Sequence, residues 1–207
     1  NDFTTINVSL TPSEGTEAVW YAWYSVEEFA AFASDQEIID AILIDCYTPA
    51  TSAKTISKSY INPGETWILA TFSVGTDGKY GEIVTGTFET KAIPYDKNIT
   101  VEFVSLVEDG NNFVATVKVT GASKVMGYNI TANDDSKATF ISNVCKNGAK
   151  ASYYGYQMAE VTDGQAVLTF EKNKYKKNYL VAAYNVTDNL VSALSEEMLV
   201  LDTVVEE

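Results

Sequence analysis

The sequence predicts an all-β protein made of two β-sandwich domains, each interrupted by a short helical insert. The first observation is a repeated stretch. Residues 67–74 and 179–186 share the order aromatic, three apolar residues, small residue, aromatic, polar residue, Val. Each copy runs into a turn-forming dipeptide, Asp77-Gly78 or Asp188-Asn189. Runs of this kind, rich in aromatic and β-branched side chains and closed by turn residues, are typical of buried strands.

The spacing of the other apolar runs and the composition are the second and third observations. Short predicted strands follow one another at roughly ten-residue spacing with turn residues between them, which is typical of β-sandwiches. The chain has 207 residues, of which 46% are hydrophobic and 20% charged, so it is globular and long enough for two domains of ordinary size. We place the domains at residues 1–94 and 95–207.

In the first domain we expect two strands, a helical insert and three further strands. Ser25 and Glu28 form a capping box that predicts the start of the insert, and helical spacing continues to about Cys46, with a break near residue 34. Before the repeated strand, Pro63 presets φ and Gly64 takes the positive-φ position of a tight turn. The strands are expected at residues 3–10, 18–24, 54–61, 67–74 and about 82–91.

The second domain follows a linker at residues 92–96, where Pro94 stops the sheet. Its strands are expected at residues 99–104, 114–119, 125–132, 166–170, 179–186 and 198–204, with a helical or irregular insert from residue 136 to about 158. The leading strand at 99–104 has no counterpart in the first domain. We therefore expect that the N-terminus is clipped, or that the sheet edge is covered by something else.

The charge excludes several classes of function. Lys and Arg number 14 against 28 Asp and Glu, every cation is Lys, and His is absent. A net charge of −14 without Arg repels nucleic acid. Without His, Ser–His and Cys–His activation and the commonest zinc ligand are missing, so we predict no enzyme, no cofactor and no metal site. A carboxylate-only mechanism remains chemically possible, but we interpret the adjacent acidic pairs as solvated surface: Glu27-Glu28, Asp134-Asp135 and Glu196-Glu197.

The two cysteines, Cys46 and Cys145, stand at matching places in the two repeats. Equivalent positions in separate domains face their own cores and not each other, so we predict two reduced, buried thiols. The sequence contains no apolar run long enough to cross a membrane.

Residues 61–69 resemble the Leu-x-Pro-Gly-Thr-x-Tyr-x-Val signature of fibronectin type III domains. Trp67 replaces the corner Tyr of that signature, whereas the second copy keeps Tyr179 and lacks the Pro-Gly turn. The resemblance implies two immunoglobulin-like, fibronectin type III-like sandwiches. For Trp67 we expect a ring buried between the sheets and an indole N–H that meets a backbone carbonyl or water.

The helical insert is similar to that of tandem fibronectin-like domains in surface lipoproteins of Bacteroidetes, which also tend to be acidic and poor in Arg. That resemblance implies an exported protein at the outer-membrane surface or in the periplasm, with a lipidated Cys upstream of residue 1. Asp202-Thr203-Val204 is similar to the short sites that receive O-glycans in that phylum.

Two functional hypotheses follow. The first is a non-catalytic spacer or interaction module for other domains or surface proteins. The second is a glycan-binding module of a polysaccharide-capture system that uses exposed aromatic side chains. Packing in the core is the competing interpretation of every aromatic candidate. The candidates lie on the second strand of the first domain and in the insert of the second: Trp20 and Trp23, with Tyr21 and Tyr24 beside them, and Tyr153, Tyr154 and Tyr156.

Overall fold

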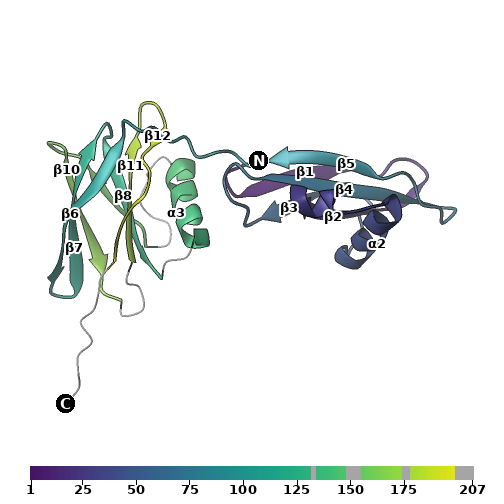
Figure 1. The fold of residues 1–207 in the computed structure, drawn as a ribbon, viewed down its shortest axis with the longest axis horizontal. Coiled ribbons are helices and arrows are strands. Elements are labelled where there is room, and N and C mark those ends of the chain that lie inside the picture. The colour runs from purple at the N-terminus through teal and green to yellow at the C-terminus, as the bar shows by residue number, and fades with distance from the viewer. Residues whose placement is uncertain (132–133, 148–154, 174–177, 199–207) are drawn as a thin grey trace, which may run out of the picture. The chain divides into compact units, whose positions relative to one another are not determined.

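A computed structural model describes residues 1–131, 134–147, 155–173 and 178–198. The chain divides into two compact units, Asn1–Ala92 and Ile93–Glu207, which are called unit 1 and unit 2 below and are described separately. Both are built mainly from antiparallel strands with helices on one face (Figure 1). The predicted all-β class with helical inserts is confirmed.

Unit 1 consists of two small sheets and two helices. One sheet pairs β1 with β3, and the other has the order β2-β4-β5. The strands are β1 (Thr5–Leu10), β2 (Thr16–Ser25), β3 (Lys54–Ser59), β4 (Thr66–Gly75) and β5 (Val84–Glu89), and the helices are α1 (Val26–Ala30) and α2 (Asp35–Asp45).

The capping box at the start of the insert forms as predicted. The Glu28 backbone N–H donates to the Ser25 hydroxyl at 3.1 Å, and the Ser25 N–H donates to the Glu28 carboxylate at 2.8 Å. Ser34 caps α2 in turn, accepting from the Glu37 N–H at 3.3 Å. Two separate caps explain why the insert forms two helices with a break between them.

The large buried cluster of unit 1 lies between the β2-β4-β5 sheet and the helices. Side chains of a strand alternate between the two faces of a sheet, so one set of residues from β2 and β4 meets α2. Ile42 and Phe72 are 0% and 1% exposed at the centre of this layer. The buried members are Ala22, Tyr24, Ile38, Ile42, Cys46, Ala70 and Phe72.

The opposite face of the same sheet points toward β1 and β3, and Trp67 lies on it. Its ring is part exposed, and the Lys58 Nζ lies 3.9 Å from the ring centroid. Nε1 of Trp67 is buried and has no hydrogen-bond partner among the described residues. The expected burial of the Trp67 ring is therefore only partial, and its indole N–H meets no backbone carbonyl among the described residues.

Unit 2 is a more complete sandwich. One sheet has the order β6-β7-β10, and the other has the order β9-β8-β11, with β12 and β13 both paired to the far side of β11. This is the strand order of an immunoglobulin-like sandwich, and the shorter sheets of unit 1 repeat part of it. The elements are β6 (Thr100–Asp109), β7 (Asn112–Thr120), β8 (Lys124–Ile130), α3 (Asp134–Asn147), β9 (Gln157–Glu160), β10 (Gln165–Glu171), β11 (Asn178–Asn185), β12 (Leu190–Val191) and β13 (Ser195–Met198).

Several predicted boundaries of unit 2 differ from the structure, and the leading strand, for example, continues to Asp109. The helix ends at Asn147, and β9 occupies the end of the expected insert. The last strand begins at Ser195, and residues 199–204 lie outside the described part of the chain. The predicted linker is fastened to unit 2, because the Val191 N–H donates to the Pro94 carbonyl at 3.1 Å and the Asp96 N–H donates to the Val191 carbonyl at 3.0 Å.

Unit 2 has two buried apolar layers. One fills the space between its sheets and includes Val117 and Tyr179, both 0% exposed. The other lies between the β8-β11 sheet and α3 and includes Phe140. Cys145 borders this second layer but is only part buried, whereas Cys46 is buried; both thiols are free. The prediction of a buried Cys145 is therefore only partly correct, because the side chain lies near the end of α3 and remains part exposed.

Candidate functional site

The aromatic residues of β2 do not form a common platform. Trp20 stacks on Phe72 with the ring planes 6° apart, on the face that meets the helices. Trp23 meets Phe88 edge to face at 5.7 Å, on the face that points toward β1 and β3. Successive side chains of a strand leave opposite faces of a sheet, so residues three apart cannot present a single surface to a sugar ring. The structure corrects the hypothesis of a shared stacking surface on this strand.

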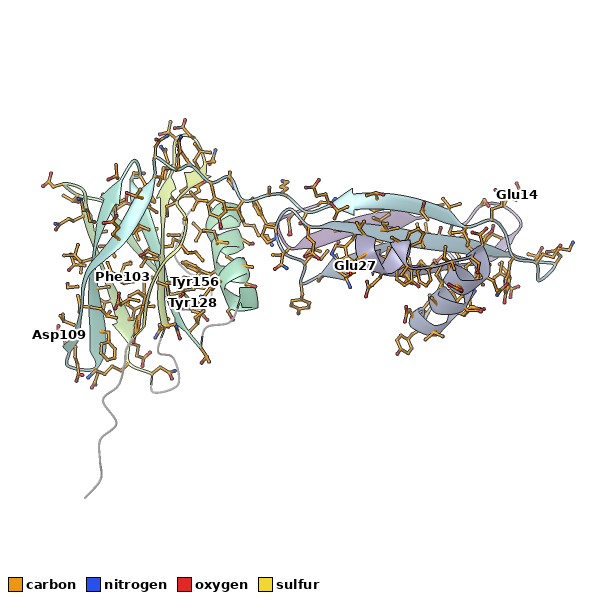
Figure 2. The ribbon with its side chains drawn as sticks, viewed as in Figure 1. Glu14, Glu27, Phe103, Asp109, Tyr128 and Tyr156 are labelled. Carbon is orange, nitrogen blue, oxygen red and sulfur yellow. The ribbon has the colours of Figure 1, made fainter. Side chains whose placement is uncertain are left out.

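Tyr156 belongs to the core of unit 2, although the sequence suggested a surface insert. It is 7% exposed, and its ring lies 4.5 Å from that of Tyr128 and 5.3 Å from that of Phe140. Its hydroxyl accepts a hydrogen bond from the Asn143 amide at 2.9 Å. Figure 2 shows Tyr128 and Tyr156 together in the part of unit 2 that carries α3. The other two candidates, Tyr153 and Tyr154, lie outside the described residues.

Two fully exposed tyrosines in unit 1 were missed by the sequence analysis. Tyr47 and Tyr60 are 97% and 101% exposed. Tyr60 also has a φ of 62°, a backbone region that a bulky residue seldom adopts and that is often associated with binding sites. It stands directly before the buried Ile61. Alternation from the buried Ile56 would have placed Tyr60 on the inner face, and nothing in the sequence indicates that the strand ends at Ser59 or that Tyr60 has a positive φ.

A polar cavity of about 230 Å³ lies at one end of unit 2. Its polar side chains include Asn129, Gln157, Lys172 and Asn173. The Asn129 amide donates to the Glu171 carbonyl at 3.1 Å, and the Lys172 ammonium pairs with a surface carboxylate, that of Glu108. Amides and an ammonium of this kind can hydrogen-bond to hydroxyl groups, but Asn129 and Lys172 already bridge neighbouring strands through these contacts.

Among the described residues, the carboxyl groups with shifted pKa values are all shifted downward. Hydrogen bonds from Ser25 lower the pKa of Glu28, the Lys79 ammonium lowers that of Asp77, and the Lys137 ammonium lowers that of Glu196. A general acid in a glycosidase needs a carboxyl group whose pKa is raised. These three groups are suited to a cap, a turn and an ion pair, not to proton donation.

The Cys145 thiol is equally unsuited to nucleophilic attack. Burial raises its pKa to about 11, and a thiol must be deprotonated to act as a nucleophile. Within the described ranges, no group of three or more Cys, Asp or Glu side chains is placed to hold a metal ion. The helices described there are too short or too polar to cross a membrane.

Comparison with known proteins gives similarity in the solved structures alone. No protein-family model and no curated protein matches the sequence. The fibronectin(III)-like modules of Clostridium thermocellum CbhA are 15% identical, with 94% of this chain and 84% of that chain covered and a TM-score of 0.29. The human OSCAR ligand-binding domain is 8% identical, with 96% and 91% covered and a TM-score of 0.30. Because both scores are low, the fold assignment rests on the strand order described above.

Proposed function

We propose that the chain is a non-catalytic tandem module that spaces or docks other domains of an exported surface protein. The observation that carries the proposal is that each unit has its own buried cluster and that the connection between the units is short. Lys91 is hydrogen-bonded within unit 1, and Pro94 is already bonded to β12 of unit 2. Such a chain joins two self-supporting sandwiches and leaves few residues free between them.

The surface chemistry supports the same proposal. The pKa values of Glu28 and Glu196 are lowered, and the pKa of the part-buried Cys145 thiol is raised. These shifts suit structural roles and not catalysis. The acidic surface and the resemblance to lipoprotein domains support an exported protein at the outer-membrane surface or in the periplasm. Its partners would then be neighbouring domains or other surface proteins.

Glycan binding is the second candidate function, and its most favourable site is now in unit 1. Tyr60 presents a fully exposed ring on a strained backbone, and rigid exposed aromatic side chains are favoured at binding sites. Tyr47 provides a second exposed ring.

Calorimetric titration of the chain with a panel of bacterial, plant and host polysaccharides separates the two functions. The spacer function predicts no saturable heat for any polymer and no release of reducing sugar. Saturable binding that disappears in Tyr60→Ala but persists in Tyr80→Ala, a change at a less exposed tyrosine, would replace the spacer function with glycan capture. Release of reducing sugar would overturn both.

A further inference from the structure

The outer face of the β6-β7-β10 sheet is a broad sheet face of unit 2 that none of its described elements covers. The other sheet has α3 on its outer side, and Phe140 and Val144 of that helix are 0% exposed against it. Figure 1 shows α3 on the side of unit 2 away from β6, β7 and β10. Side chains of these three strands alternate between the inner layer, which includes Val117 and Leu168, and the bare outer face.

β-Branched side chains fill the middle of this outer face. Val104, Val107 and Val167 are 60%, 53% and 57% exposed, and among the exposed large apolar side chains in the described part of unit 2 only Tyr95 and Val186 lie elsewhere. Such clusters of exposed apolar side chains mark interaction surfaces. We call this cluster the valine face. It comprises two neighbouring cross-strand rows, Val107-Val114-Thr169 and Ser105-Thr116-Val167, with Val104 beside them at a bulge of β6.

The matching face of unit 1 is polar. The Ser57 hydroxyl donates to the Asn7 carboxamide oxygen across it at 2.6 Å, while Ile6 and Ile56 alternate with these residues and are buried on the inner side. The outward cross-strand pairs of β1 and β3 are Thr5-Ser59, Asn7-Ser57 and Ser9-Thr55. Hydroxyl and amide side chains are thus sufficient on the outer face of this sheet. The valine face is therefore specific to unit 2 and not a requirement of the shared strand order.

The two ends of the valine face differ in charge. Lys118 is exposed at one end and makes no ion pair among the described residues. It lies six residues along β7 from Asn112, which is about 20 Å in a strand, so it cannot reach the carboxylates of the far end within one molecule. The row at the first end is Glu102-Lys118-Gln165, and the row at the far end is Asp109-Asn112-Glu171. Figure 2 shows Asp109 at the tip of the β6–β7 hairpin.

We propose that the valine face pairs with the same face of a second copy of this chain, with the strands of the two copies antiparallel. A two-fold axis that runs across the strands brings the two valine faces together. It places Lys118 near the partner subunit's Asp109 and the partner subunit's Glu171, which is the complementary arrangement of charge. A two-fold axis along the strands would instead set the acidic end of one copy against the acidic end of the other.

The size of the valine face predicts a weak dimer. Three strands about 4.8 Å apart and four rows about 7 Å apart give a face of roughly 15 Å by 25 Å. A stable interface buries about 800 Å² on each partner, so this contact lies at the small end of the range. Two copies with a net charge of −14 also repel each other. We therefore expect dimers at protein concentrations of about 100 μM and not of about 1 μM, in about 150 mM salt.

Sedimentation equilibrium of the full chain between about 5 and 500 μM tests the proposal. Val167→Lys places an unpaired ammonium in the apolar contact and should raise the Kd of the dimer more than about 10-fold. Val186→Lys is the matched control, because Val186 is an exposed valine of unit 2 outside the valine face, and it should change the Kd less than about twofold. Val167→Thr, which keeps the shape of the side chain, should give a smaller loss in the same direction. Far-UV circular dichroism checks that each variant is folded.

Charge reversal tests the antiparallel arrangement. Lys118→Glu should raise the Kd about three- to tenfold, because it sets a third carboxylate near the acidic end of the partner subunit. Adding Glu171→Lys to the same chain should restore part of this loss. Because the two residues are about 20 Å apart within one molecule, such a rescue reports contact between two copies.

Three results would overturn the proposal. The first is a chain that stays monomeric up to about 500 μM, which would assign the valine face to a different partner. The second is an equal loss of dimer in Val167→Lys and Val186→Lys. The third is a double charge reversal that dimerises no better than Lys118→Glu alone.

Discussion

The strands of unit 1 repeat part of the strand order of unit 2, but the two units bury their side chains differently. In both, helices cover the sheet that contains the repeated strand, and the layer beneath them is well buried (Figure 1). Between the sheets, however, Tyr179 of unit 2 is 0% exposed, whereas Trp67 at the matching place in unit 1 is part exposed. The ring of Tyr179 packs against Phe113 of β7 and Phe170 of β10, whereas Lys58 of β3 lies over the ring of Trp67. Unit 2 also has β6 beside this layer, and β6 has no counterpart among the described strands of unit 1.

This difference shows that the helical insert and the leading strand support separate layers of the sandwich. Unit 1 keeps its helix-side cluster, with Ile42 and Phe72 almost fully buried, although Trp67 and Val84 on the inter-sheet side are more exposed. A small domain loses a large share of its buried area when one strand is missing, so we expect unit 1 to be the less stable unit.

Truncation at the two matching aromatic positions is the largest expected effect. Tyr179→Ala should destabilise unit 2 by about 3–5 kcal/mol, because it removes a fully buried ring from the core. Trp67→Ala should destabilise unit 1 by only about 1–3 kcal/mol, since its ring is part exposed. Urea unfolding followed by Trp emission for unit 1 and by far-UV circular dichroism for both units measures the two losses. A loss at Trp67 equal to that at Tyr179 would contradict the comparison.

High pH should destabilise unit 2 through its part-buried thiol. Burial raises the pKa of Cys145 from its ordinary value of 9.0 to about 11, and burial also raises the pKa values of Tyr95 and Tyr184 nearby. The unfolded chain therefore loses these protons first, and the stability that is present below about pH 9 decreases as the pH rises toward 11. Urea midpoints at pH 7, 9 and 10 measure the decrease. Cys145→Ser should reduce the slope, and an unchanged slope would count against this cause.

Loss of the first helix cap should have a smaller effect, confined to unit 1. Ser25→Ala removes the hydroxyl that accepts from the Glu28 N–H and should cost about 1 kcal/mol. The exposed Ser52 provides a matched control, because Ser52→Ala removes a hydroxyl outside any helix cap. Trp emission in urea measures both variants. Equal midpoints for the two would mean that the capping box does not stabilise the helical layer.

Removal of one hydroxyl should have the smallest effect. The Tyr179 hydroxyl is buried and makes no hydrogen bond of good geometry among the described residues, although the Asn129 side chain is close enough to affect its pKa. Tyr179→Phe should therefore change the stability of unit 2 by less than about 0.5 kcal/mol. A loss of more than about 1 kcal/mol in the same urea assay would show that this hydroxyl makes the backbone bond of a tyrosine corner.

Local patterns predicted much of this fold. The repeated strand, the capping box at Ser25 and the turn at Gly64, whose φ is 76°, depend on neighbouring residues and were read correctly from them. The short strands β9 and β12 were missed because their own patterns are weak, and the partner of β9, which is β8, is also distant in the sequence.

The candidate site was less predictable, because exposure depends on tertiary packing. Strand alternation in the predicted strand already separates Trp20 from Trp23, but the sequence could not show that Tyr156 is enclosed by α3 and Tyr128. The exposed Tyr60 was missed because a positive φ at a bulky residue is set by the surrounding fold.

Amide hydrogen exchange along β1 and β7 tests the central claim most directly. If β1 is paired on one side only, the amide of Ser9 should exchange much faster than those of Val8 and Leu10, whereas the amides of β7 should be protected without alternation. Uniform slow exchange along β1, or the same alternation in β7, would contradict the account.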